Sequence, residues 1–123
     1  MRDAIVFETH PAVRSGLERR LDAEPDVMVL DTFCDVDLFV EAVRRLEPAV
    51  AVVGLFGPHG VEAANGAALV AKPGTSVIAV VPYLWPETAR RLGRGVTLVQ
   101  DGPRGHRLAA EVRSPRPAAP SFG

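Results

Sequence analysis

The sequence lacks most features that mark secreted, membrane-spanning or nucleic-acid-binding proteins. Its single cysteine, Cys34, excludes a disulfide within the chain and is typical of a reducing compartment. No apolar run approaches the roughly 20 residues that a membrane-spanning helix needs. A formal net charge of −1 gives no overall attraction to nucleic acid or to an anionic membrane. The N-terminal Met-Arg-Asp runs straight into an apolar segment and leaves no room for a signal peptide, so a cytoplasmic protein is expected.

What the chain does have is an alternation of short apolar runs and amphipathic segments. The apolar runs predict strands at 4–7, 27–30, 49–53, 77–81 and 96–99. Helices are predicted at 11–23, from a cap at Asp35 or Asp37 to a stop at Pro48, and at 61–71, 87–92 and 104–113. The inner face of the second helix is predicted to consist of Leu38, Phe39, Ala42, Val43 and Leu46.

The third and fourth helices are predicted to be short. Asn65-Gly66 interrupts the third, and the prolines at 82 and 86 leave little more than a turn and a half for the fourth. The segment 114–123, SPRPAAPSFG, has the composition of a linker. The predicted organisation is therefore one domain over 1–113, followed by a Pro-rich linker or tail over 114–123.

This pattern predicts an α/β fold with a doubly wound, five-stranded parallel sheet. Strands as apolar as these are covered on both faces, and right-handed crossovers are the default. The best-known layout of this size is the flavodoxin-like strand order 2-1-3-4-5. In that order the first and third strands are neighbours. Glu8, Thr9 and Gly54, which end those strands, would then share one crevice.

The loop after the third strand is where an open α/β fold places its chemistry. Here the strand ends at Gly54, which carries no carboxylate, hydroxyl, thiol or imidazole. The glycines at 54, 57 and 60 would let backbone amides approach an anion, but their spacing matches neither Gly-x-Gly-x-x-Gly nor a P-loop. One hypothesis is therefore a stand-alone flavodoxin-like nucleotide-binding protein or small enzyme that uses Glu8, Thr9 and the Gly54–Gly60 loop.

Other side chains near the strand ends have a structural and a functional interpretation. His10 and His59 with Glu8 between them would suit a metal or acid–base site, whereas His10 also suits the entry of a helix. The aromatic and apolar residues of the two flanking loops would cover the sheet end, line a recess for a small ligand or form a docking surface: Phe56, Tyr83, Leu84 and Trp85. Cys34 is predicted to be a small buried residue, and the arginine pairs 19–20, 44–45 and 90–91 to be solvated.

The opening of the chain also carries an ordered set of motifs. After the first strand come His10-Pro11, Gly16-Leu17, Leu21 and Pro25-Asp26. This segment resembles the opening of response-regulator receiver domains, closest to the branch with a LuxR-type helix-turn-helix. Further matches follow in order: Glu47-Pro48, Gly57-Pro58, Pro73-Gly74-Thr75, Gly93 and Glu111-Val112-Arg113. The resemblance spans about residues 4–113.

The resemblance implies a phosphoryl pocket with a nucleophilic carboxylate, an acidic pair for Mg²⁺, a hydroxyl and a lysine. In this sequence the nucleophile falls on Gly54, the acidic pair on Glu8 and Thr9, the hydroxyl on Val81 and the lysine on Gln100. Only Glu8 keeps the required kind of group. The pocket is therefore predicted to be degenerate, with no catalytic residue, no metal and no cofactor.

The resemblance thus implies a regulatory domain and not an enzyme. The expectation is a phosphorylation-independent, receiver-like domain of a transcriptional regulator that acts by self-association as a homodimer, through a partner or through a small ligand. DNA would be bound only by a separate helix-turn-helix domain downstream, because none is present in these residues. The possible ligand or partner contacts are His10, Phe56, His59, Tyr83 and Trp85. A stand-alone adaptor is the alternative within the same class.

Overall fold

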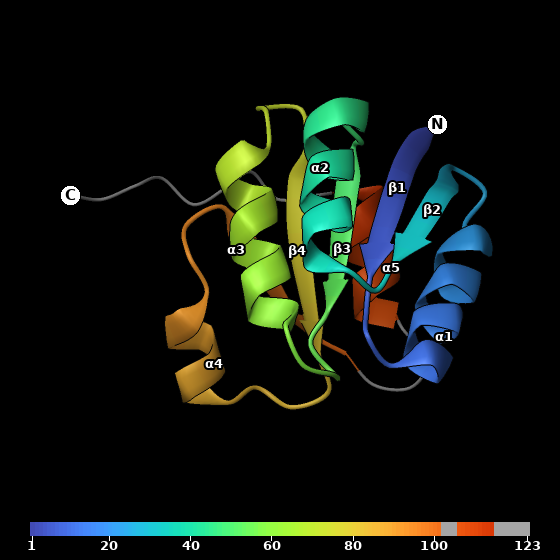
Figure 1. Cartoon of the computed structure of the whole chain (residues 1–123). Coiled ribbons are helices and arrows are strands. Elements are labelled where there is room, and N and C mark those ends of the chain that lie inside the picture. Colours follow the sequence, from blue (N-terminus) through green and yellow to red (C-terminus); the bar gives the residue numbers. More distant parts are fainter. Residues whose placement is uncertain (102–105, 115–123) are drawn as a thin grey trace.

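Five parallel strands form one sheet in the order β2-β1-β3-β4-β5, as the sequence predicts (Figure 1). The computed structural model describes residues 1–101 and 106–114. Strands and helices alternate along the chain: β1 (Arg2–Phe7), α1 (Pro11–Asp22), β2 (Val27–Phe33), α2 (Val36–Leu46), β3 (Val50–Gly54), α3 (Gly60–Val70), β4 (Ser76–Val81), α4 (Pro86–Arg91), β5 (Val96–Gln100) and α5 (His106–Arg113). The predicted start of the last helix and almost all of the predicted tail lie outside the described residues.

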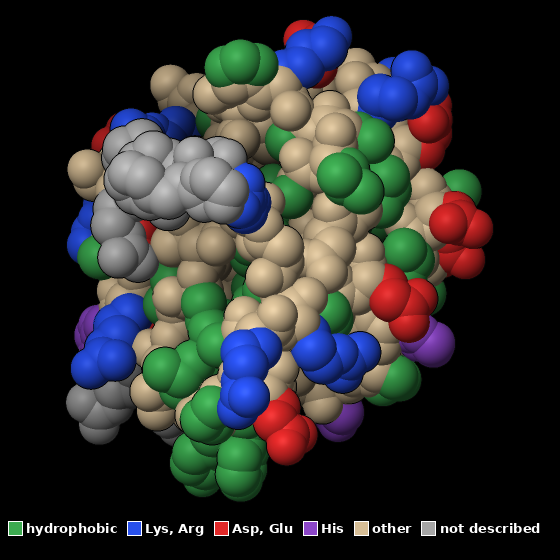
Figure 2. Space-filling view, turned by 90° about the vertical axis from the view of Figure 1, so that its left-hand side faces the viewer, with side chains coloured by type: hydrophobic (Ala, Val, Ile, Leu, Met, Phe, Trp, Pro, Cys, Tyr) green, Lys and Arg blue, Asp and Glu red, His purple; other side chains and the backbone are tan. Residues whose placement is uncertain are grey.

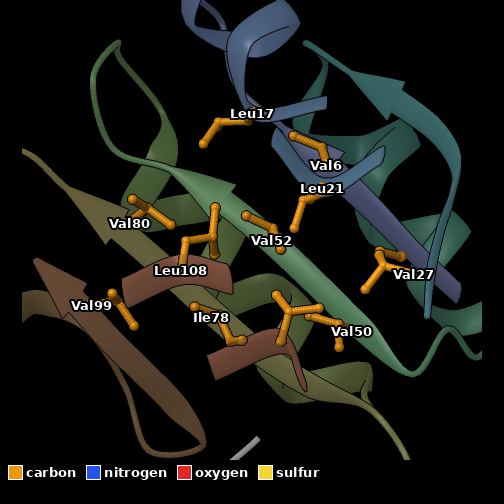
Figure 3. Close-up of a cluster of buried hydrophobic side chains, with 12 residues drawn as sticks. Val6, Leu17, Leu21, Val27, Val50, Val52, Ile78, Val80, Val99 and Leu108 are labelled. Carbon is orange, nitrogen blue, oxygen red and sulfur yellow. The ribbon is translucent and has the colours of Figure 1, made fainter. Parts of the chain in front are cut away.

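The sheet separates two apolar cores because successive side chains of a strand point to opposite faces. One core joins β1, β3 and β4 to Leu17 and Leu21 of α1 and Leu108 of α5 (Figure 3). The other core joins alternate residues of the same strands to α2 and α3, which lie in front of the sheet in Figure 1. All five residues of β3 are buried, as expected for a central parallel strand.

Local capping explains where the first two helices begin. The Nδ1 atom of His10 accepts a hydrogen bond from the backbone N–H of Val13 at 3.3 Å, with Pro11 in the first turn. The Oδ1 atom of Asp35 accepts from the N–H of Leu38 at 2.9 Å. His10 therefore has the helix-entry role that the sequence allowed, and Asp35 is the cap of α2.

Two predictions near α2 are wrong. The side chain of Leu38 is 63% exposed and that of Leu46 is 37% exposed, so only Phe39, Ala42 and Val43 form the inner face. Val36 and Val40 of the same helix pack against the core in their place. Cys34 is exposed and not buried, because it follows β2 in the short turn before α2.

The third helix covers nearly the predicted segment 61–71, but the predicted interruption at Asn65-Gly66 is wrong. α3 runs without interruption over 11 residues, the same length as α2. Gly66 allows the close approach of α2, since a Cβ atom there would lie 2.8 Å from Cγ2 of Val40. The fourth helix is short as predicted, with six residues and no buried side chain. No helix in the described part of the chain is long and apolar enough to cross a membrane.

Candidate functional site

The carboxyl ends of β1 and β3 meet at one edge of the sheet, which brings Glu8 and Gly54 together. Phe7 pairs with Val53, so the next residues, Glu8 and Gly54, lie side by side where the two strands end. The side chain of Glu8 is fully buried. Its Oε1 atom accepts a hydrogen bond from the N–H of Phe56 at 2.9 Å, and its Oε2 atom accepts from the N–H of His10 at 2.8 Å. The carboxylate therefore ties the β1–α1 turn to the β3–α3 loop.

Gly54 and Gly57 of the β3–α3 loop lie so close to the side chains of Glu8 and Thr9 that neither position has room for a Cβ atom. A Cβ atom on Gly54 would lie 2.5 Å from Oε1 of Glu8, closer than side-chain atoms approach one another. A Cβ atom on Gly57 would lie 2.1 Å from Oγ1 of Thr9 and 2.9 Å from Oε2 of Glu8. The space that side chains at 54 and 57 would need is already filled by Glu8 and Thr9.

Two further hydrogen bonds close the crevice. The hydroxyl of Thr9 donates to the carbonyl oxygen of Pro58 at 3.3 Å. Nη1 of Arg14 donates to the carbonyl oxygen of Glu8 at 2.9 Å, which fixes the backbone that carries the carboxylate. The predicted crevice of Glu8, Thr9 and Gly54 thus forms, but its interior is occupied by the chain itself.

The remaining pocket positions lie along the same edge of the sheet. Val81 at the end of β4 is buried and pairs with Gln100 at the end of β5, whose side chain is exposed. The next residue, Asp101, is buried, and its Oδ2 atom accepts from the N–H of Leu108 in α5 at 2.9 Å. The edge therefore offers neither a nucleophile at position 54 nor a cation at position 100.

Solved structures with the same arrangement of elements are receiver domains. The receiver domain of the response regulator NarL from Mycobacterium tuberculosis has a TM-score of 0.68 at 19% identity, covering 91% of this chain and 93% of that one. The receiver domain of RcsB from Salmonella enterica serovar Typhimurium, solved with the phosphomimetic BeF₃⁻, has a TM-score of 0.70 at 20% identity, covering 94% and 91%. The chain has a receiver fold.

A LuxR-family response regulator from Aurantimonas has a TM-score of 0.68 at 18% identity, with 92% of this chain and 84% of that one covered. The sequence alone matches no protein-family model and no curated protein. Similarity at these identities establishes the receiver fold. It does not establish a chemical activity for this chain.

The histidines near the receiver edge do not converge. His10 caps α1, whereas Nδ1 of His59 lies 3.4 Å from Oε1 of Glu62 in the first turn of α3. Within residues 1–101 and 106–114, no group of three or more His, Cys, Asp or Glu side chains could hold a metal ion. The two histidines therefore each serve the start of their own helix.

The loop residues proposed as ligand contacts are mostly exposed. Phe56 is 39% exposed, Tyr83 67% and Trp85 64%, so these rings do not cover the sheet end. A cavity of about 200 Å³ lies between the β3–α3 loop and α4, and its lining is Leu55, Gly57, Pro58, His59, Gly60, Val61, Glu62, Thr88 and Arg91. Of the proposed contacts, only His59 lines this cavity.

Sequence reasoning missed two polar residues that position elements of the receiver fold. Nδ2 of Asn65 donates to the carbonyl oxygen of Arg91 at 2.9 Å, and the N–H of Gly93 donates to Oδ1 of Asn65 at 2.6 Å. Asp101 holds the first part of α5. The role of Asp101 could have been predicted, because a polar residue directly after a strand and before a helix often caps that helix. The contact of Asn65 with the end of α4 could not, because the two segments are distant in the sequence.

Proposed function

We propose that this chain is a regulatory receiver-like domain of a transcriptional regulator and that it works without phosphorylation of its own pocket. The observation that carries the proposal is the Glu8 carboxylate. It fills the space beside Gly54 and accepts the N–H of Phe56, which is the backbone donor that the loop would offer to an incoming anion. Regulation would then depend on contact with another molecule and not on phosphoryl transfer.

The other pocket positions support the same conclusion. Gly54 has no atom to attack a phosphoryl group, and Thr9 with one carboxylate gives few of the oxygen ligands that Mg²⁺ prefers. Val81 has no hydrogen-bonding side chain, and Gln100 has no charge to neutralise phosphoryl oxygens. Loss of one group would be a local change. Loss at four positions of one pocket favours a receiver whose regulatory surfaces persist without its chemistry.

The alternative of a nucleotide-binding protein or small enzyme is disfavoured by the same contacts. Such a protein would need a free loop and space beside the strand ends for a phosphate or substrate. Here Glu8 and Thr9 occupy the space that Gly54 and Gly57 leave open. The cavity next to the loop is lined by residues of the β3–α3 loop and of α4, and Glu8 is not part of its lining.

The decisive test is exposure to Mg²⁺ and beryllofluoride, followed by backbone NMR. We expect the amide signals of residues 8–10 and 54–57 to stay in place at low millimolar concentrations, while the RcsB receiver domain, which was solved with BeF₃⁻, serves as the control for active reagent. Incubation with acetyl phosphate should likewise leave the protein mass unchanged. Specific shifts of the Glu8 and Gly54 signals, or a stoichiometric phosphoryl adduct, would contradict the proposal.

The regulatory role is proposed by analogy with LuxR-family neighbours that share the receiver fold. In this proposal the domain lies in the cytoplasm, forms homodimers and leaves DNA contact to a separate helix-turn-helix domain. Sedimentation equilibrium tests the homodimer directly. A monomer at all concentrations up to the millimolar range would contradict self-association and leave contact with a different partner as the mode of action.

A further inference from the structure

The cavity between the β3–α3 loop and α4 lies beside the crevice of Glu8 and Thr9, and neither of these residues is part of its lining. It has a volume of about 200 Å³. Its lining comes from three segments: residues 55 and 57–59 of the loop, residues 60–62 in the first turn of α3, and Thr88 and Arg91 of α4. Figure 2 shows the side of the molecule that carries α3 and α4, where acidic, basic and histidine side chains lie close together in the lower half.

Two opposite charges line this cavity without pairing with each other. Glu62 is in the first turn of α3, and Arg91 is the last residue of α4. Oε1 of Glu62 lies 3.4 Å from Nδ1 of His59, and no ion pair joins the two described residues Glu62 and Arg91. A ligand with a single charge would be attracted by one of them and repelled by the other. A ligand that carries both charges can satisfy both.

The size and the remaining lining of the cavity favour a small ligand with a short apolar part. The volume equals that of about seven water molecules in the liquid, and it is below the roughly 300–1,000 Å³ of ordinary small-molecule sites. A nucleotide is therefore too large. Half-buried Thr88 offers a hydroxyl, and the apolar part of the lining consists of Leu55, Pro58 and Val61. Within the described residues no cluster of side chains could hold a metal ion, so a divalent cation is not the ligand expected here.

We propose that this cavity binds a small zwitterion, namely an amino acid with a short apolar side chain. Its carboxylate would pair with the guanidinium of Arg91 and accept from the hydroxyl of Thr88. Its ammonium group would pair with the carboxylate of Glu62. Its side chain would lie against Leu55 and Val61. This proposal deepens the proposed function and rests on it only in that the domain responds to a bound molecule and not to phosphorylation.

Such a ligand would fix α4 relative to α3. α4 has no buried side chain, and Asn65 of α3 holds only its end, through the carbonyl of Arg91 and the N–H of Gly93. A zwitterion held by Glu62 on α3 and by Arg91 on α4 binds best when the two helices lie as they do here. It would therefore shift the population toward the conformation in which α4 is ordered.

The test is a titration of the chain with L-valine, followed by backbone NMR. Valine carries both charges and a short apolar side chain, whereas isovalerate lacks the ammonium group and L-valinamide lacks the carboxylate. We expect saturable shifts of the amide signals of residues 55–62 and 86–93, with a Kd of about 1 mM or lower, because exposed ion pairs are individually weak. Either analogue should bind about tenfold more weakly. Hydrogen exchange at the amide of Gly93 should become slower when valine is bound.

Two charge-neutralising variants assign the two ends of the ligand. Glu62→Gln should remove the preference for valine over isovalerate, because the ammonium group loses its partner. Arg91→Gln should remove the preference for valine over valinamide, because the carboxylate loses its partner. Glu87→Gln and Arg90→Gln are the matched controls, since these residues of α4 do not line the cavity, and they should leave both preferences unchanged. Circular dichroism would establish that the variants are folded.

Three outcomes would overturn the proposal. The first is the absence of saturable shifts with L-alanine, L-valine and L-leucine up to about 10 mM. The second is equal binding of valine and either analogue, which would show an anion or cation site and not a zwitterion site. The third is a set of shifts centred on residues 8–10, which would place the ligand in the receiver crevice. A response of the Glu8 signals to Mg²⁺ with beryllofluoride would contradict the phosphorylation-independent function, and the valine titration is read independently of it.

Discussion

Oε1 of Glu8 lies 2.5 Å from the point where a Cβ atom on Gly54 would stand, so the two residues share one volume at the sheet edge. Where the resemblance to receivers implies a carboxylate on the third strand, this chain has a carboxylate from the first strand turned toward the same place. The exchange keeps a negative group in the pocket but gives it two backbone N–H partners, from Phe56 and His10. The Glu8 carboxylate therefore links the β1–α1 turn to the β3–α3 loop.

The first prediction concerns the hydrogen bonds of Glu8. Glu8→Gln keeps the size of the side chain but replaces one acceptor oxygen with a donor, so one of the two N–H groups loses its partner. We expect the free energy of unfolding to fall by about 1–3 kcal/mol. Urea denaturation followed by circular dichroism measures this. Glu18→Gln on α1 is the control, and a result for Glu8→Gln within about 0.5 kcal/mol of it would contradict the structural role.

The second prediction concerns the shared volume. Gly54→Ala should destabilise the protein by about 1–3 kcal/mol, because the added methyl group meets a buried and hydrogen-bonded carboxylate. In a Glu8→Ala background the same change should cost much less, with a coupling energy above about 1 kcal/mol. Gly74→Ala is the matched control, since no atom lies within 4 Å of a Cβ at that position. Strict additivity of the two changes would show that the residues do not compete for space.

The third prediction concerns the anchoring of α4. Asn65→Ala removes both hydrogen bonds to the end of this helix, and no buried side chain of α4 compensates. Because such an opening is local, we expect the amide of Gly93 to exchange with solvent about tenfold faster, with little change in global stability. Hydrogen exchange followed by NMR measures this. Leu69→Ala changes an 87% exposed residue of α3, the helix that carries Asn65, and should leave the exchange unaltered.

The fourth prediction concerns a surface ion pair on α2. The side chain of Arg44 donates hydrogen bonds to the carboxylate of Glu41 and holds its pKa below the usual value. Since the folded pKa is the lower one, the contribution to stability is present above the unfolded pKa and disappears as the pH falls through the folded pKa. Both groups are exposed, so the effect on stability is small and weakens with salt.

Arg44→Gln should therefore raise the pKa of Glu41 toward its ordinary value, as measured by an NMR pH titration of the side-chain carboxyl. Arg45→Gln should raise it less, because Arg45 lowers the pKa through its charge alone. An unchanged titration of Glu41 in Arg44→Gln would show that the pair does not form in solution.

The fifth prediction concerns Cys34. Its thiol is exposed in the folded chain, so it should react with a disulfide reagent such as DTNB under native conditions at a rate close to that in urea. A buried thiol would react only as fast as the protein opens. A reaction that becomes fast only on unfolding would contradict the exposed position.

Most of the fold was predictable because buried strands and helix faces appear in the sequence as apolar runs and periodic apolar residues. The unbroken apolar run at the third strand indicated a strand covered on both faces, and all of β3 is buried. The prolines at 82 and 86 indicated a short fourth helix, and α4 has six residues. The inner face of α2 was predicted less well. The helical period predicts which residues share one broad face of the helix. Whether Leu38 on that face is buried depends on the elements that pack against it.

The sequence by itself also determined what the pocket cannot do. Gly54 has no nucleophile, Val81 no hydroxyl and Gln100 no charge, and no folding of the chain can add these groups. The sequence predicted that Glu8 and Gly54 share a crevice, but it did not determine that the Glu8 carboxylate fills it, because that depends on the hydrogen bonds from the N–H groups of Phe56 and His10. It also did not reveal that Asn65, which looks like an interruption of a helix, brackets the end of another one.

Composition and periodicity are properties of neighbouring residues, and they predicted the strands, most of the helices and the missing chemistry, whereas the strand order was expected from the best-known layout for a sheet of this size. Contacts between side chains of distant loops depend on how the finished elements pack. Only the tertiary structure therefore decided that Glu8 fills the space left by Gly54, that Tyr83 and Trp85 stay exposed and that the end of α4 is held by Asn65.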